Sequence, residues 1–106
     1  MIKHAEWLIV GHSKDFPNRM GRTIRLDDNE IAVFRTSENK LYAVENSSPH
    51  PKGGPLTEAM VSGHYIYDPL CDWKIDLETG IVQEPDHGQI KTFTIREDGE
   101  EVKISL

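Results

Sequence analysis

The chain alternates short extended segments with turn signals, and this pattern constrains its fold more than any other feature. The segments share alternating apolar and polar positions, or many β-branched and aromatic residues, which are typical of strands. We expect strands in residues 23–28, 30–36, 40–46, 60–67, 90–97 and 101–106. Asp98-Gly99 lies between the last two segments and indicates a hairpin, because glycine tolerates a positive φ angle. We expect no helix beyond one turn in residues 13–22, which Pro17 and Gly21 interrupt.

Two loops rich in glycine and proline interrupt the strand pattern. The first reads "SSPHPKGGPLTEA" (residues 47–59) and the second reads "DPLCDW" (residues 68–73). They lie on either side of the strand expected in residues 60–67, so they can meet at one end of a sheet. The sequence therefore predicts an all-β, antiparallel sandwich or barrel, with both loops at one end of a single domain over residues 1–106.

Charge and cysteine content exclude several classes of protein. The 106 residues carry a formal net charge of −6, which argues against a nucleic-acid partner because phosphate binding needs clustered lysine and arginine. No apolar run approaches the roughly 20 residues of a membrane span, and the apolar N-terminal patch is too short for a signal peptide. The single cysteine, Cys71, excludes an internal disulfide and fits a reducing compartment. We therefore expect a cytoplasmic protein without a membrane partner.

The two loops and the residues after them resemble a known family. The chain has "ENSSPHPKGGPLTEAMVSG", then "YDPLCDWKIDLETG", then "GIVQEPDHGQIKTFTI". These segments resemble the Rieske-type [2Fe-2S] domain, in which the boxes C-x-H and C-x-x-H each give one ligand to each iron. The tail from Trp73 to Gly80 is the strongest part of the resemblance. Within this family, the chain most resembles the small subunit of assimilatory NAD(P)H-dependent nitrite reductase, the NirD type.

The four ligand positions differ from those of the family. Without a gap, "DPLCDWKID" aligns with the family's second box so that Asp68 takes the cysteine position and Cys71 the histidine position. In the first box Ser48 takes the cysteine position and His50 the histidine position. A second alignment would instead use Cys71 as the cysteine and Lys74 in place of histidine, but the flanking residues contradict it. The resemblance therefore implies that His50 alone keeps its ligand type.

The altered ligand set predicts that the chain holds no cluster. One iron would face Ser48 and Asp68, two hard oxygen side chains, whereas iron–sulfur clusters are held by soft thiolates. One alternative is a single zinc or iron held by His50, Cys71 and Asp68 with Ser48 or water. Another is a nucleophilic pair of Cys71 and His50. We expect neither a metal nor a catalytic residue, and we expect the loops to persist for their shape, with Cys71 as a small buried apolar residue.

The resemblance also implies a function. The chain would be the non-catalytic small subunit of an oxidoreductase that reduces nitrite to ammonia in nitrate assimilation. A large subunit would carry flavin, a [4Fe-4S] centre and sirohaem, and the small chain would assemble with it or tune its electron flow. Two alternatives stay open: a Rieske ferredoxin that carries single electrons, and a stand-alone interaction module that has the fold without a redox role.

Overall fold

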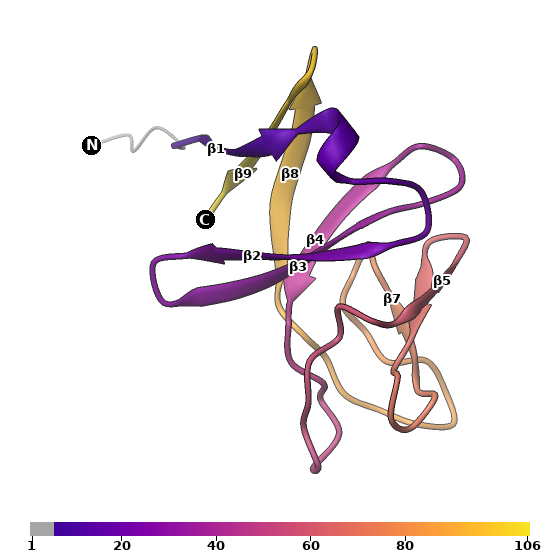
Figure 1. Ribbon diagram of the computed structural model, residues 1–106. Coiled ribbons are helices and arrows are strands. Elements are labelled where there is room, and N and C mark those ends of the chain that lie inside the picture. Colours follow the sequence, from indigo (N-terminus) through magenta and orange to yellow (C-terminus); the bar gives the residue numbers. More distant parts are fainter. Residues whose placement is uncertain (1–5) are drawn as a thin grey trace.

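The chain forms two antiparallel sheets in the computed structural model, which describes residues 6–106 (Figure 1). The six-stranded sheet has the order β1-β9-β8-β4-β3-β2, and the three-stranded sheet has the order β5-β6-β7. Their strands are β1 (Leu8–His12), β2 (Gly21–Leu26), β3 (Asn29–Arg35), β4 (Leu41–Glu45), β5 (Met60–Ser62), β6 (Tyr65–Tyr67), β7 (Lys74–Asp76), β8 (Thr92–Asp98) and β9 (Glu101–Ser105). One 3-10 helix, η1 (Ser13–Asp15), follows β1. The expected all-β, antiparallel fold is confirmed.

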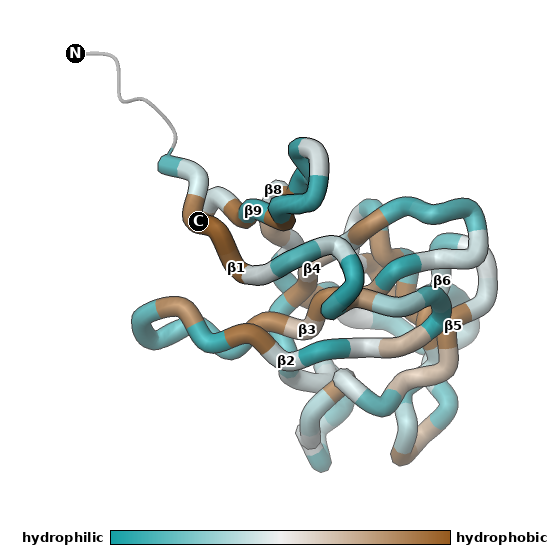
Figure 2. Tube along the Cα trace, turned by 45° about the horizontal axis from the view of Figure 1, so that its top comes forward, coloured by the Kyte–Doolittle hydropathy of each residue, from teal (hydrophilic) through white to brown (hydrophobic). Residues whose placement is uncertain are grey.

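Turn chemistry explains the hairpins of the larger sheet. Strands β8 and β9 pair from Thr94–Ser105 to Asp98–Glu101, and Gly99 closes the predicted hairpin with a φ angle of 61°. Strands β2 and β3 are joined after Leu26 by a two-residue turn in which Asp27 has a φ angle of 54°, a conformation that aspartate tolerates better than most residues. Figure 2 shows hydrophilic and hydrophobic residues alternating along β2, the pattern of a half-buried strand.

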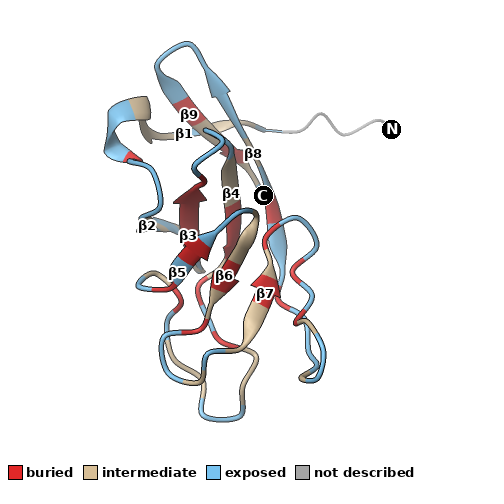
Figure 3. Ribbon diagram, turned by 90° about the vertical axis from the view of Figure 1, so that its right-hand side faces the viewer, coloured by how far each residue is buried: buried red, intermediate tan, exposed pale blue. Residues whose placement is uncertain are grey.

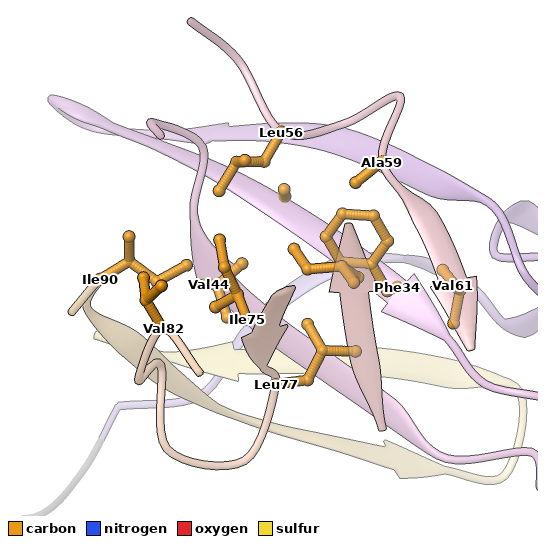
Figure 4. Close-up of a cluster of buried hydrophobic side chains, with 11 residues drawn as sticks. Phe34, Val44, Leu56, Ala59, Val61, Ile75, Leu77, Val82 and Ile90 are labelled. Atoms are coloured by element: carbon orange, nitrogen blue, oxygen red, sulfur yellow. The ribbon is translucent and has the colours of Figure 1, made fainter. Parts of the chain in front are cut away.

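Strands β3 and β4 are buried on both faces and separate two hydrophobic clusters. Residues 31–34 of β3 are fully buried, and Figure 3 shows this strand in red. Its side chains alternate between the two clusters. One cluster joins the two sheets and contains Ala32, Phe34, Val44, Leu56, Ala59, Val61, Ile66, Ile75, Leu77, Val82 and Ile90 (Figure 4). The other contains Phe16, Ile31, Val33, Ala43, Phe93, Val102 and Ile104. The small sheet is therefore held to the large one mainly by apolar burial, which is the dominant stabilising term in folding.

The structure departs from the expected strands in three places. The strand expected over residues 60–67 is a hairpin of two short strands, because Gly63 turns the chain with a φ angle of 59°. Strands β1 and β7 were not predicted, since neither segment shows a long alternation of apolar and polar residues. The one turn expected in residues 13–22 is η1, which ends before Phe16 and Pro17. Within residues 6–106, no helix has the length and apolar character needed to cross a membrane.

Candidate functional site

The two loops rich in glycine and proline lie at the same end of the molecule, as predicted. Loop 1 (residues 47–59) connects β4 to β5, and loop 2 (residues 68–73) connects β6 to β7. Both project from the end opposite β1 and the β8–β9 turn (Figures 1 and 3). Their four aligned ligand positions are Ser48 and His50 in loop 1 and Asp68 and Cys71 in loop 2. The structure brings all four residues to this end of the fold.

Ser48 and Asp68 form a buried hydrogen bond between the two loops. The Ser48 hydroxyl donates to Asp68 Oδ2, and the residues are 7% and 1% exposed. Asp68 Oδ1 accepts from the backbone N–H of Leu70 at 2.9 Å, and Ser48 Oγ accepts from the backbone N–H of His50 at 3.1 Å. No cationic side chain within residues 6–106 forms an ion pair with Asp68. Hydrogen bonds alone therefore compensate for the burial of this carboxyl group.

Backbone turns set the position of Ser48 in loop 1. The Ser48 N–H donates to the carbonyl of Gly54 at 2.8 Å, and the Gly53 N–H donates to the carbonyl of His50 at 2.7 Å. Gly53 and Gly54 have φ angles of 65° and 109°, which residues with a side chain rarely adopt. A Cβ atom on Gly54 would lie 3.0 Å from Leu70 Cδ1 in loop 2. Glycine at this position therefore lets the two loops approach each other closely.

Loop 2 is a tight turn closed by its own backbone. The Asp68 N–H donates to the carbonyl of Trp73, and the Asp72 N–H donates to the carbonyl of Asp68, both at 2.9 Å. Asp72 has a φ angle of 60°, in the left-handed region. Strand β7 follows at once and pairs with β6, so the turn has a fixed base. This geometry places the Asp68 side chain inward and leaves Leu70 71% exposed at the tip.

His50 and Cys71 line a small pocket between the loop tips. The pocket has a volume of about 90 Å³, and its walls are His50, Lys52, Gly53, Asp68, Leu70 and Cys71. The His50 ring contacts Trp73 edge-on, with 4.8 Å between ring centroids, and His50 Nδ1 accepts from the Lys52 N–H at 3.0 Å. Cys71 is a free, partly exposed thiol, so the expectation that it packs as a buried apolar residue is wrong.

The surroundings of Cys71 raise the pKa of its thiol. Desolvation raises the pKa of Cys71 above its ordinary value, and the charge of Asp68 raises it further. The backbone of Trp73 forms a hydrogen bond that lowers the Cys71 pKa and offsets part of this rise. Because the thiolate is the form that attacks electrophiles and binds metals, this environment disfavours both reactions.

The residues present do not fit a [2Fe-2S] cluster. The four positions offer one thiol, one imidazole and two oxygen side chains, whereas a Rieske centre takes two thiolates and two imidazoles. The two oxygen side chains are already bonded to each other. Within residues 6–106, no three side chains of histidine, cysteine, aspartate or glutamate are grouped as a metal ion would need. The chemistry of this donor set favours a loop contact over cofactor binding.

Lys74, which the second alignment puts in place of a histidine, lies outside the pocket between the loop tips. Lys74 is in β7, opposite Tyr67 in β6, and its Nζ atom lies 4.2 Å from the centroid of the Tyr65 ring. It is not among the residues that line the pocket. Lys52, a further wall of the pocket, was not predicted as a site residue, because only the meeting of the two loops brings it to the site.

The known proteins that this chain resembles agree with one another in their fold. A family model described as a Rieske-like [2Fe-2S] domain matches residues 6–105. A Mycobacterium tuberculosis structure described as a candidate NADH-dependent nitrite reductase small subunit has a TM-score of 0.88 at 15% identity, covering 98% of this chain and 97% of that one. The Escherichia coli protein NirD gives 0.83 at 19% identity, covering 96% and 97%. At such identities these likenesses establish the fold alone.

Proteins of other functions share the same fold. The ferredoxin of carbazole 1,9a-dioxygenase from Nocardioides aromaticivorans gives a TM-score of 0.82 at 20% identity, covering 92% of this chain and 95% of that one. A 4beta-methylsterol monooxygenase from Methylococcus capsulatus is 30% identical over 70 residues, which are 66% of this chain. The matched segment is 19% of that monooxygenase, so the likeness extends over only a small part of it.

Proposed function

The chain belongs to the Rieske-like [2Fe-2S] domain family, and we propose that it acts as a cluster-free small subunit of an NAD(P)H-dependent nitrite reductase. In this proposal the chain has no activity of its own. It assembles with a large subunit that carries flavin, a [4Fe-4S] centre and sirohaem, and that reduces nitrite to ammonia in nitrate assimilation. The small chain stabilises that subunit or tunes its electron flow.

The buried hydrogen bond between Ser48 and Asp68 is the observation that carries this proposal. A one-electron carrier needs its cluster, and here the two aligned cysteine positions hold oxygen side chains bonded to each other. A subunit that only docks needs the loops but not the cluster. The fold is also shared, over nearly the whole length of both chains, with structures described as nitrite reductase small subunits.

The loop tips are suited to contact a larger protein. Leu70 is 71% exposed at the tip of loop 2, beside the pocket that loop 1 completes. Pro49, Pro51 and Pro69 restrict the backbone of the two loops, which lowers the entropy lost when a partner orders them. An exposed leucine on a preorganised tip is a suitable anchor for an apolar hollow in the partner.

Co-purification from cells that naturally carry the chain tests the proposal. We expect the tagged chain to bring down a large protein with flavin and sirohaem absorption. Deletion of the chain should abolish or sharply reduce nitrite-dependent NAD(P)H oxidation in extracts. A chain that is recovered alone, from cells whose nitrite reduction survives the deletion, would contradict the proposal.

Two substitutions refine the same experiment. Leu70→Asp places a charge on the loop tip and should weaken recovery of the large protein. Ile9→Asp is the matched control, because Ile9 is 60% exposed on β1, at the opposite end of the molecule (Figure 1). Equal recovery with both variants would show that the loop tips are not the docking surface.

A ferredoxin-type electron carrier is the second candidate. The fold, which a ferredoxin shares at a similar TM-score, favours it. This function requires a cluster, so protein prepared without air that lacks iron and acid-labile sulfide would exclude it. An interaction module without a redox role would also lack the cluster, but its deletion would leave nitrite reduction intact.

A further inference from the structure

We propose that the hydrogen bond from Ser48 to Asp68 is a polar latch that joins loop 1 to loop 2 in place of a metal cluster. In a Rieske centre each loop gives one ligand to each iron, so the cluster itself crosslinks the loops. In this chain the aligned positions crosslink the loops directly. The latch rests on one part of the proposed function, the absence of a cluster, and does not depend on which partner the chain has.

Burial makes this contact a strong one. A hydrogen bond from a hydroxyl to a carboxylate is shorter and stronger than one between neutral groups. Ser48 is 7% exposed and Asp68 is 1% exposed, so water cannot easily take the place of either group. If one partner is removed, the other keeps a buried polar atom without its hydrogen bond, and that loss is costly.

The latch also fixes backbone atoms on both sides. Ser48 Oγ accepts from the His50 N–H in loop 1, while Asp68 Oδ1 accepts from the Leu70 N–H in loop 2. His50 and Leu70 both line the pocket between the tips. One hydrogen bond between side chains therefore sets the position of residues on both walls of this pocket.

The other contacts between the loops are not hydrogen bonds. The His50 ring meets Trp73 edge-on, and Gly54 lies close to Leu70 Cδ1. Within residues 6–106 the only hydrogen bond that links loop 1 to loop 2 is the latch. Loss of the Ser48 hydroxyl should therefore loosen loop 2 as well as loop 1.

Amide hydrogen exchange of the 106-residue chain tests this inference. In Ser48→Ala we expect the Leu70 and Asp72 amides of loop 2 to exchange about tenfold faster or more, from the usual cost of an unsatisfied buried group. Ser47→Ala is the matched control, because Ser47 is the exposed neighbour of Ser48 and should leave these amides unchanged. A role of Ser48 confined to loop 1 would change only amides of loop 1. Unchanged exchange in loop 2 would overturn the latch.

A double-mutant cycle provides the second measurement. Asp68→Ala should speed exchange at His50 in loop 1, and Ser48→Ala/Asp68→Ala should be no faster there than the faster single variant, because both changes break the same bond. Additive effects would overturn the latch. If Asp68→Ala does not fold, the hydrogen exchange of Ser48→Ala compared with that of Ser47→Ala still tests the latch. Both measurements use the isolated chain. The latch can therefore be confirmed when the nitrite reductase proposal fails, and it can fail when that proposal is confirmed.

Discussion

The Ser48 hydroxyl donates a buried hydrogen bond to the carboxylate of Asp68 across twenty residues of sequence. The two side chains come from the two loops whose sequences resemble the ligand boxes of a Rieske centre. Their contact joins the two positions that align with the cysteines of those boxes, and it is a hydrogen bond between oxygen side chains. The fold is therefore compatible with two ways of joining the same loops, by metal coordination or by a hydrogen bond.

Loss of the Ser48 hydroxyl should destabilise the protein. Ser48→Ala leaves Asp68 Oδ2 buried without its donor, so we expect the free energy of unfolding to fall by about 1–3 kcal/mol. Ser47→Ala changes an exposed residue and should stay within about 0.5 kcal/mol of the wild type. Urea denaturation followed by tryptophan fluorescence measures both variants. Equal midpoints for the two variants would mean that the Ser48–Asp68 bond adds no net stability.

The thiol of Cys71 should react slowly at neutral pH. Desolvation and the neighbouring charge of Asp68 raise its pKa, so the reactive thiolate is scarce. We expect the rate at which iodoacetamide alkylates Cys71 to rise with pH, with a higher midpoint in the folded chain than in denaturant. The midpoint in denaturant should lie at about pH 8.5. Mass spectrometry at each pH gives both curves. A folded midpoint at or below that of the denatured chain would contradict this description of the site.

Away from the site, the ion pair of Arg35 and Glu97 should make stability depend on pH. The buried Arg35 guanidinium donates to both carboxylate oxygens of Glu97, at 3.2 and 2.8 Å. These hydrogen bonds lower the pKa of Glu97 below its ordinary value. The stabilisation is therefore present above the unfolded pKa of about 4.3 and is lost as the pH falls through the folded pKa.

Two variants test this pH dependence. Glu97→Gln should be less stable than the wild type at pH 7, and the difference should shrink as the pH falls below 4. Glu58→Gln is the control, because Glu58 is exposed and forms no ion pair among residues 6–106. Urea midpoints across this pH range provide the measurement. A difference for Glu97→Gln that persists unchanged in acid would show that the charge of Glu97 is not its source.

Variants that carry the family's cysteine and histidine ligands at the aligned positions test the alignment of the two boxes. Ser48 and Asp68 already touch, and His50 and Cys71 line one pocket, so Ser48→Cys/Asp68→Cys/Cys71→His should gain iron and sulfide on anaerobic reconstitution. The competing alignment is represented by Ser48→Cys/Lys74→His. We expect no cluster in that variant, because Lys74 lies in β7 beside the Tyr65 ring. Visible absorption and iron content compare the two, and a cluster formed only in the second would reverse the alignment.

Much of the architecture follows from local sequence patterns. Residues 30–36 and 40–46 were predicted as strands because their β-branched and aromatic residues are typical of strands, and β3 and β4 confirm this. The strand expected over residues 60–67 is divided because Gly63 permits a turn inside an apolar run. Strand β7 has only three residues and is formed by pairing with β6, which no local pattern indicates.

The site was predictable in its location but not in its contacts. The two loops were expected to meet because they flank residues 60–67. A single strand there would separate them, and the hairpin of β5 and β6 is what returns the chain and brings both loops to the same end. The contact of Asp68 with Ser48 joins residues that lie twenty positions apart in the sequence, so no local pattern indicates it. The burial of Arg35 was missed for the same kind of reason, since its partner Glu97 is distant in sequence.

Iron and acid-labile sulfide in protein purified without air provide the most direct test of the cluster-free account. We expect colourless protein with neither iron nor sulfide in stoichiometric amount, because the donor set offers one thiol and a bonded pair of oxygen side chains. The measurement should be repeated on Ser48→Ala, which removes the latch and should also remain colourless. Brown protein with two irons and two sulfides per chain would contradict the account, because Ser48 and Asp68 could not then be bonded to each other.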